Sequence, residues 1–133
     1  MELVGIVGLL ALIEYWVFLM LTGQARGRFG VAAPATAGHP IFERYFRVQM
    51  NTLEQLAIFL PALGVFAWSV SEAWAVLLGV VFIVGRALYA RGYIQDPAKR
   101  GPGFLLTLIA NGALVLGSLV ALALRLPGVL MHG

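Results

Sequence analysis

The sequence predicts an all-α membrane protein, a bundle of four transmembrane helices forming a single domain over residues 1–133. Composition is the first observation behind this prediction: 61% of the residues are hydrophobic and only 11% are charged, whereas soluble domains are about 45–50% apolar and about 25% charged. The second observation is that the apolar residues form four long runs, each near the roughly 20 residues that a helix needs to cross a bilayer. Little of the chain is left for a soluble domain.

The first expected helix covers residues 3–22, which is long enough to cross about 30 Å of hydrocarbon. The chain starts with Met1-Glu2 and no basic segment, and no small-residue cleavage site follows, so this helix is not expected to be a signal peptide. Glu14 lies near its middle. An ionisable group at that depth marks a functional site by default, and the alternative is a carboxyl that is protonated or paired with a neighbouring helix. Residues 23–40 are rich in glycine and proline, which predicts a loop.

Three further helices are expected at residues 41–68, 73–95 and 104–124. Pro40 stands just before the second helix, where proline suits the first turn, and Pro61 inside that helix is expected to kink it. Ser71 is the expected N-cap of the third helix. Residues 96–103 are expected to form a turn, because proline, glycine and aspartate are frequent there, and residues 125–127 are expected to end the fourth helix.

The basic residues are unequally divided between the two ends of such a bundle. Of the nine, only Arg125 falls on the side of the termini; the others lie at or near the first and third connections. Because cytoplasmic loops carry an excess of Lys and Arg, these connections are expected to face the cytoplasm. Basic residues scattered at segment ends do not suggest a nucleic-acid partner. A single lysine among the nine, with abundant Ala, Gly, Leu and Val, hints at a GC-rich bacterial genome and therefore at a bacterial inner membrane.

The composition also excludes several kinds of chemistry. The chain has no cysteine, which rules out disulfides, zinc–thiolate sites and a cysteine nucleophile. Thiol chemistry would therefore need a thiol carried by a substrate. The two histidines, His39 and His132, are far apart in the sequence and form no cluster of metal ligands, so no metal is expected.

The most polar stretch of the chain, residues 42–55, leads directly into an almost wholly apolar run. Charged groups persist beside such runs mostly where they face a protein interior or a wet cavity. On a helix, Arg47, Asn51 and Glu54 share one face at positions i, i+4 and i+7. This cation, amide and carboxylate suit a zwitterionic small molecule. The alternative is a helix end whose polar groups satisfy one another.

A second set of polar side chains lies near the end of the third expected helix. Arg86, Tyr89 and Tyr93 share a face at positions i, i+3 and i+7. Tyrosines at this depth are also common in an aromatic belt. Because this face, residues 42–55 and the two basic connections all lie at one level of the membrane, we expect a crevice there that accepts an anion.

Two motifs resemble those of a known family. The segment Phe42-Glu43-Arg44-x-x-Arg47-x-Gln49-x-Asn51-x-x-Glu54 resembles the signature of the MAPEG superfamily, the membrane-associated proteins in eicosanoid and glutathione metabolism. The spacing Arg86…Tyr89…Gly92-Tyr93…Arg100 is similar to that of its branch of microsomal glutathione transferases and leukotriene C synthases. The resemblance covers nearly the whole chain. It implies a homotrimer that binds glutathione as co-substrate, without a metal, in crevices between neighbouring subunits.

The resemblance also implies roles for residues by position. One subunit would hold the tripeptide with Arg47, Asn51, Glu54, Tyr89 and Tyr93, and the next subunit would contribute Arg26 and Gln49. Helix geometry supports this division, because Gln49 lies about 200° around the helix from Arg47. Arg100 matches the arginine that stabilises the glutathione thiolate in the leukotriene-forming members. That thiolate would attack a lipophilic electrophile entering from the membrane lipids, or reduce a lipid hydroperoxide, which is a detoxification reaction.

The chain departs from the leukotriene-forming members at two places, which leaves the lipid substrate open. Gln55 stands where they have a tyrosine, and Gly27 stands where they have a second arginine, with Arg28 one residue further on. The favoured interpretation is a glutathione transferase or peroxidase. The alternatives are a non-catalytic, lipid-binding scaffold of the same fold, which the superfamily also contains, and a small multidrug or proton exporter, for which Glu14 would be the key residue.

Overall fold

The computed structural model describes residues 1–132 and contains four long helices and one short 3-10 helix. Their bounds are α1 Glu2–Phe29, α2 Pro40–Ser69, α3 Glu72–Gln95, the 3-10 helix η1 Pro97–Arg100, and α4 Gly101–His132. All four long helices are long and apolar enough to cross a membrane. The predicted all-α fold with four candidate spans is therefore confirmed.

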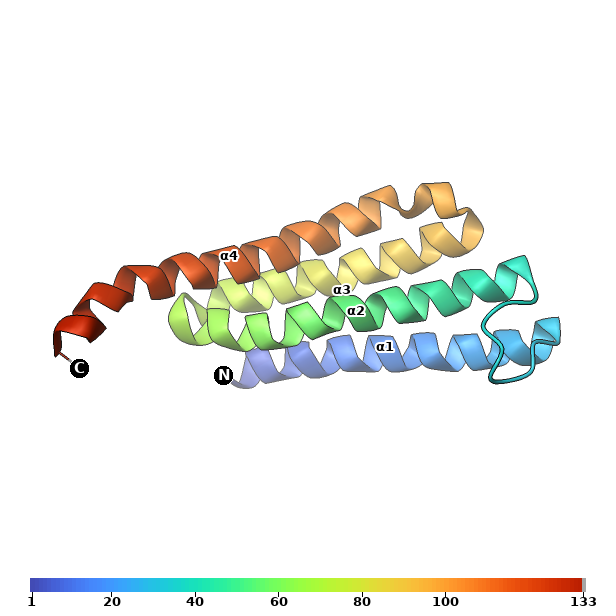
Figure 1. The fold of residues 1–133 in the computed structure, drawn as a ribbon, viewed down its shortest axis with the longest axis horizontal. Helices are drawn as coiled ribbons and strands as arrows, with labels where there is room; N and C mark the ends of the chain where they lie inside the picture. Colours follow the sequence, from blue (N-terminus) through green and yellow to red (C-terminus); the bar gives the residue numbers. More distant parts are fainter. Residues whose placement is uncertain (133) are drawn as a thin grey trace.

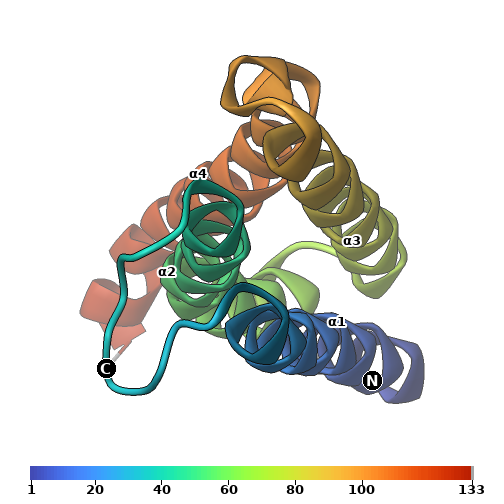
Figure 2. The same ribbon diagram turned by 90° about the vertical axis from the view of Figure 1, so that its right-hand side faces the viewer.

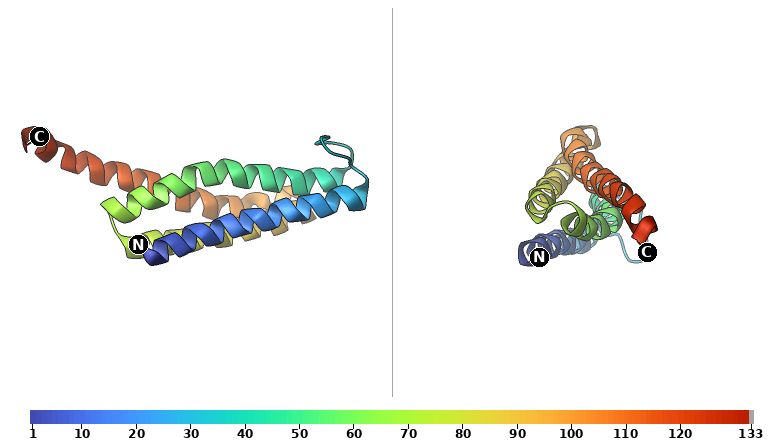
Figure 3. Two further views of the ribbon diagram at one scale, coloured as in Figure 1. Left: turned by 90° about the horizontal axis from the view of Figure 1, so that it is seen from below. Right: turned by 90° about the vertical axis from the view of Figure 1, so that its left-hand side faces the viewer.

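The helices run up and down beside one another, so that the α1–α2 and α3–α4 connections lie at one end of the bundle (Figure 1). The N-terminus and the short α2–α3 connection lie at the opposite end. Viewed along the bundle, α2 lies between α1 and α4 (Figure 2). Helix α3 packs against all three of the other helices. Helix α4 extends beyond the other three helices at the end where the N-terminus lies (Figure 3).

Three of the predicted helix boundaries are wrong. Helix α1 does not end at residue 22; it continues to Phe29 and ends where Gly30 takes a left-handed conformation with φ of 69°. Isolated glycines cost only about 1 kcal/mol each within a helix, so two of them do not stop it. Helix α4 begins at Gly101 rather than residue 104 and continues through Pro127 to His132, because a proline inside a helix removes one hydrogen bond without having to end it.

The predicted helix starts at the other connections are confirmed. Pro40 occupies the first turn of α2, and the His39 side chain caps that helix, with Nδ1 accepting a hydrogen bond from the Ile41 amide at 3.1 Å. The Ser71 hydroxyl caps α3, accepting from the Trp74 amide at 3.2 Å. Of residues 96–103, expected as a turn, Asp96 caps η1, and the remaining seven form η1 and the first residues of α4.

The core of the bundle is built from aromatic and aliphatic side chains of all four helices. At its centre the rings of Phe59 and Phe82 stack with centroids 4.0 Å apart. The other buried members are Val4, Val7, Ala11, Leu56, Leu63, Phe66, Ala67, Ala75, Ala110 and Leu114. Large apolar side chains such as Leu9, Trp16 and Leu108 are exposed on the outside. In lipid, such a bundle is held by close packing rather than by removal of apolar surface from water.

Helices α3 and α4 approach each other most closely at two glycines. A Cβ atom on Gly103 would overlap the backbone nitrogen of Tyr89, and one on Gly85 would lie 2.9 Å from Cβ of Leu106. Small residues of this kind allow helix backbones to pack closely in membranes. The contact fixes the first turn of α4 against α3, and it thereby holds Arg100 near the tyrosines of α3.

Candidate functional site

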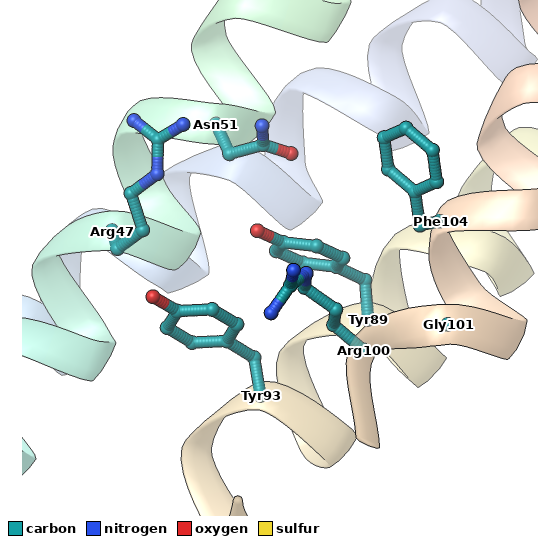
Figure 4. Close-up of a pocket in the computed structure, with 7 residues that line it drawn as sticks. All are labelled: Arg47, Asn51, Tyr89, Tyr93, Arg100, Gly101 and Phe104. Carbon is teal, nitrogen blue, oxygen red and sulfur yellow. The ribbon is translucent and has the colours of Figure 1, made fainter. Parts of the chain in front are cut away.

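A cavity of about 580 Å³ opens between α2, α3 and the start of α4, at the end of the bundle that carries the basic connections. It is lined by Arg47, Asn51, Tyr89, Tyr93, Arg100, Gly101 and Phe104 (Figure 4). The lining thus contributes two guanidinium groups, two phenols and one amide, and no carboxylate from residues 1–132. A space of this size and charge suits a small anionic molecule, since ligand pockets are usually about 300–1,000 Å³.

The α2 side of the cavity carries the polar face predicted from the sequence. Arg47 and Asn51 line it directly, and Glu54 forms an ion pair with Arg47 in which the nitrogen and oxygen lie 3.5 Å apart. Both side chains of this pair are about half exposed. An exposed pair of this kind contributes only about 0–1 kcal/mol, so a ligand can readily compete for either partner.

The α3 side of the cavity carries the two tyrosines. The rings of Tyr89 and Tyr93 stack with centroids 5.6 Å apart. Tyr89 is buried, and Figure 4 shows both hydroxyls directed across the cavity toward α2. Two phenol groups aimed at one space can donate hydrogen bonds to an anion bound there.

Arg100 reaches the cavity from the junction of η1 and α4 (Figure 4). Its Nη1 donates a hydrogen bond to the Pro97 carbonyl at 3.0 Å, and its side chain is otherwise exposed. Asp96 begins η1 by accepting from the Ala98 amide at 3.1 Å. This short helix turns the chain from α3 into α4, and so it places a guanidinium at the mouth of the cavity.

Arg86 lies directly behind the cavity wall and is completely buried. Its Nη2 donates to Asn51 Oδ1 at 2.7 Å, and its guanidinium carbon lies 4.3 Å from the centre of the Tyr89 ring. It also donates to the hydroxyls of Thr52 at 3.0 Å and Thr107 at 3.3 Å. The sequence placed Arg86 on the face of Tyr89 and Tyr93 but assigned it no part in binding.

Besides Glu54, which is linked to the cavity only through its ion pair with Arg47, two predicted site residues do not line the cavity of their own chain. Arg26 donates to the Ala35 carbonyl, and its guanidinium lies 4.8 Å from the centre of the Phe42 ring. Gln49 is 8% exposed, and its Nε2 lies 3.4 Å from the sulfur of Met50. Both were assigned to a neighbouring subunit's site, and that assignment stays a prediction, because the structure describes one chain.

An apolar groove of about 270 Å³ between α2 and α4 adjoins the polar cavity, and Phe104 lines both. Within the groove, Asn111 Nδ2 donates to Gln55 Oε1 at 2.9 Å, and apolar side chains such as Ile58 and Leu108 form most of the remaining lining. An anionic molecule in the cavity would therefore lie beside a lipophilic molecule in the groove. The sequence did not predict Phe104 as a site residue, because α4 was expected to begin there and its helical register was unknown.

The four candidate membrane-spanning helices define a multi-pass membrane protein. The cationic, tyrosine-lined cavity beside an apolar groove is its candidate small-molecule site. The chain belongs to the MAPEG family, whose model matches residues 3–120. The family membership that the two motifs predicted is thus confirmed.

Individual relatives agree with this membership. An uncharacterized protein of Synechocystis sp. is 46% identical over 117 residues, which cover 88% of this chain and 85% of the relative. Microsomal glutathione S-transferase 2 of Homo sapiens is 39% identical over 106 residues, covering 80% of this chain and 72% of the relative. Leukotriene C4 synthase of Mus musculus is 37% identical over 109 residues, covering 82% of this chain and 68% of the relative.

Proposed function

We propose that this protein is a membrane-bound glutathione transferase, with glutathione peroxidase activity as a second reaction of the same site. The observation that carries the proposal is that one cavity gathers Arg47, Asn51, Tyr89, Tyr93 and Arg100. The similarity to a microsomal glutathione S-transferase supports the choice of ligand.

The groups around the cavity complement glutathione, which carries two carboxylates, one ammonium and one thiol. Arg47 would bind a carboxylate, for which the planar guanidinium offers two parallel hydrogen bonds. Glu54, now paired with Arg47 at 3.5 Å, would then bind the ammonium group. Asn51 would contribute an amide hydrogen bond. The exposed ion pair of the free protein is thus exchanged for two ion pairs with the ligand.

Arg100 and the two phenols are proposed to activate the thiol. A free thiol has a pKa of about 8.5, and the thiolate is the nucleophile. A positive charge within ~4–6 Å of the sulfur lowers the thiol pKa by about 1–3 units. Arginine suits this task because it keeps its charge throughout the physiological range. Hydroxyl donors from Tyr89 and Tyr93 would further stabilise the developing negative charge on sulfur.

The adjoining apolar groove would supply the second substrate. With an electrophile, the sulfur forms a bond to carbon while a leaving group departs with the bonding electrons. With a lipid hydroperoxide, the sulfur attacks the terminal oxygen and the O–O bond breaks, which releases the lipid alcohol and glutathione sulfenic acid. A second glutathione then converts the sulfenic acid to glutathione disulfide and water.

The proposed enzyme is a homotrimer in which the neighbouring subunit's copies of Arg26 and Gln49 complete each site. The cavity and the basic connections lie at the same end of the bundle. We propose that this end faces the cytoplasm, a proposal that the excess of basic residues there supports. We propose that this membrane is the bacterial inner membrane.

The alternative with structural support is a non-catalytic, lipid-binding scaffold. The groove between α2 and α4 favours it, because the groove could hold a lipid chain without any reaction. An exporter has less support. Its key residue, Glu14, does not line the cavity, and one of its carboxyl oxygens is buried inside the bundle.

Calorimetric titration of glutathione into the detergent-solubilised protein tests the proposal, together with turnover assays using a chromogenic aryl halide and a fatty-acid hydroperoxide. We expect saturable binding and turnover of at least one of the two substrates. Binding of glutathione with turnover of neither would support the scaffold, and the absence of binding would contradict glutathione as the ligand.

A further inference from the structure

We infer that Arg86 is a positioning residue, which fixes the Asn51 amide and the Tyr89 ring in the orientations that they present to the ligand. The inference rests on the proposed function, because the ligand is taken to be glutathione. Arg86 comes from α3, is 0% exposed, and does not line the cavity. It therefore acts only through the residues that it contacts.

The first of these residues is Asn51. An amide side chain has an oxygen that accepts hydrogen bonds and a nitrogen that donates them, whereas a guanidinium can only donate. Because Arg86 Nη2 donates to Asn51 Oδ1 at 2.7 Å, the oxygen is held toward the protein interior. The NH₂ group is then the part left to face the cavity. Arg86 thus makes Asn51 a donor, which suits a carboxylate or carbonyl oxygen of glutathione.

The second residue is Tyr89. The Arg86 guanidinium carbon lies 4.3 Å from the centre of its ring, a close cation–π contact. The ring of Tyr89 in turn stacks on Tyr93 at 5.6 Å. A cation behind the ring also favours negative charge at the phenol oxygen, so the hydroxyl becomes a stronger hydrogen-bond donor to a bound thiolate. One buried guanidinium thus supports both tyrosines of the cavity.

The remaining contacts show how Arg86 itself is held in place. It donates to the hydroxyl oxygens of Thr52 and Thr107. Each of these hydroxyls uses its own proton to bond a backbone carbonyl one turn earlier, Val48 at 2.8 Å and Gly103 at 3.0 Å. Both oxygens are therefore oriented to accept. Arg86 is fixed in this way to α2 and α4 before any ligand arrives.

Cohesion of the bundle alone does not account for a buried arginine. Burying a guanidinium is costly, and well-packed apolar side chains of similar volume often stabilise a protein as well or better. Within residues 1–132, Arg86 forms no ion pair that would offset this cost. The cost of burying the Arg86 guanidinium is explained by its role in orienting two residues of the cavity, Asn51 and Tyr89.

A double-mutant cycle on glutathione affinity tests the inference. Calorimetry would give the dissociation constants of the unmodified protein, Arg86→Met, Asn51→Ala and the double variant. Arg86→Met and Asn51→Ala should each weaken binding on the order of tenfold, the effect of losing one hydrogen bond to a charged group. Because Arg86 acts through Asn51, the double variant should bind much more tightly than the product of the two effects predicts.

The chain offers a matched control. Arg125, at the opposite end of the bundle, likewise combines a hydrogen bond with an aromatic contact: it donates to the backbone carbonyl of Ser69, and its guanidinium carbon lies 5.7 Å from the centre of the Trp68 ring. Arg125→Met should leave the glutathione affinity unchanged. Arg86→Lys keeps a buried cation if the methionine variant fails to fold, and it should weaken binding in the same non-additive way, because one ammonium cannot both bond Asn51 and cover Tyr89.

The outcomes separate the two proposals. Multiplicative effects in the cycle, or an Arg86→Met or Arg86→Lys variant with the affinity of the unmodified protein, would overturn the positioning role while leaving the glutathione site intact. Failure of the unmodified protein itself to bind glutathione would overturn the proposed function, and the positioning role together with it.

Discussion

Arg47 and Glu54 form an ion pair on the cavity face of α2, with Nη1 and Oε1 3.5 Å apart. The two residues are seven positions apart, so the pair spans two turns of the helix. Both side chains are about half exposed, and the pair therefore contributes little to the stability of the free protein. In the proposed site, the pair places a cation and an anion side by side, where each could exchange its partner for an oppositely charged group of a zwitterionic ligand.

Replacement of Arg47 should therefore affect ligand binding more than folding. Arg47→Ala is expected to weaken glutathione binding by about 1.5–3 kcal/mol, the range for hydrogen bonds to charged groups, with little change in the unfolding temperature. Calorimetry and thermal unfolding in detergent measure both quantities. Arg91→Ala is the control, since Arg91 is an exposed arginine near the end of α3 that does not line the cavity. Equal losses in the two variants would mean that the effect is general electrostatic attraction.

The four helices could be predicted from the sequence because each is an apolar run long enough to cross a membrane. The ends of these helices could not be predicted, because tertiary contacts there override the local turn signals of the sequence. Gly101 and Gly103 indicate a turn, yet Gly103 lies in α4, against the backbone of Tyr89. Residues 23–29 stay helical although two glycines lie among them, and this last turn of α1 contains Arg26, which packs on Phe42 across the loop.

Part of the candidate site could be predicted from helical periodicity, and Arg100, which also lines the cavity, was predicted from the family motif. Arg47 and Asn51 share a face by spacing alone, and so do Tyr89 and Tyr93; the structure brings all four to one cavity. The bond from Arg86 to Asn51 depends on how α2 and α3 are rotated relative to each other, which no single-helix pattern contains. The contributions of a neighbouring subunit, Arg26 and Gln49 among them, stay predictions from resemblance.

The close approach of α3 and α4 leads to a prediction about packing. Gly103→Ala should destabilise the protein by about 1–3 kcal/mol or more, because the added methyl group would overlap the Tyr89 backbone and force the helices apart. It should also lower turnover, since Arg100 and Tyr89 would separate. Gly64→Ala is the control, because a Cβ there meets no atom of the described chain within 4 Å. Unfolding temperatures that match in the two variants would contradict the packing described.

The proposed sharing of sites between subunits predicts a trimer. Mass measurement of the detergent-solubilised protein should give three chains of 14.3 kDa after correction for bound detergent. Arg26→Ala should weaken glutathione binding even though Arg26 lies outside the cavity of its own chain. A monomer with full affinity for glutathione would show that the site is complete within one chain.

Glu14 should be dispensable for ligand binding. One oxygen of its carboxyl is buried within the bundle, and the residue does not line the cavity. Glu14→Gln is expected to leave glutathione affinity unchanged within the error of calorimetry, because the amide preserves the shape of the side chain. Loss of proton-coupled transport in this variant, alongside normal behaviour of Arg47→Ala, would favour the exporter.

The most direct test of the account is the ultraviolet absorbance of thiolate on mixing the protein with glutathione, followed against pH. We predict a thiolate signal well below the ordinary thiol pKa of about 8.5, and a return of the apparent pKa toward that value in Arg100→Ala. This variant should also lose far more turnover than glutathione affinity, because Arg100 acts on the reacting sulfur. An unchanged signal in Arg100→Ala would assign activation to another group, with Arg28 or Arg26 the next candidates. Bound glutathione that gives no thiolate signal in the unmodified protein would contradict the catalytic account.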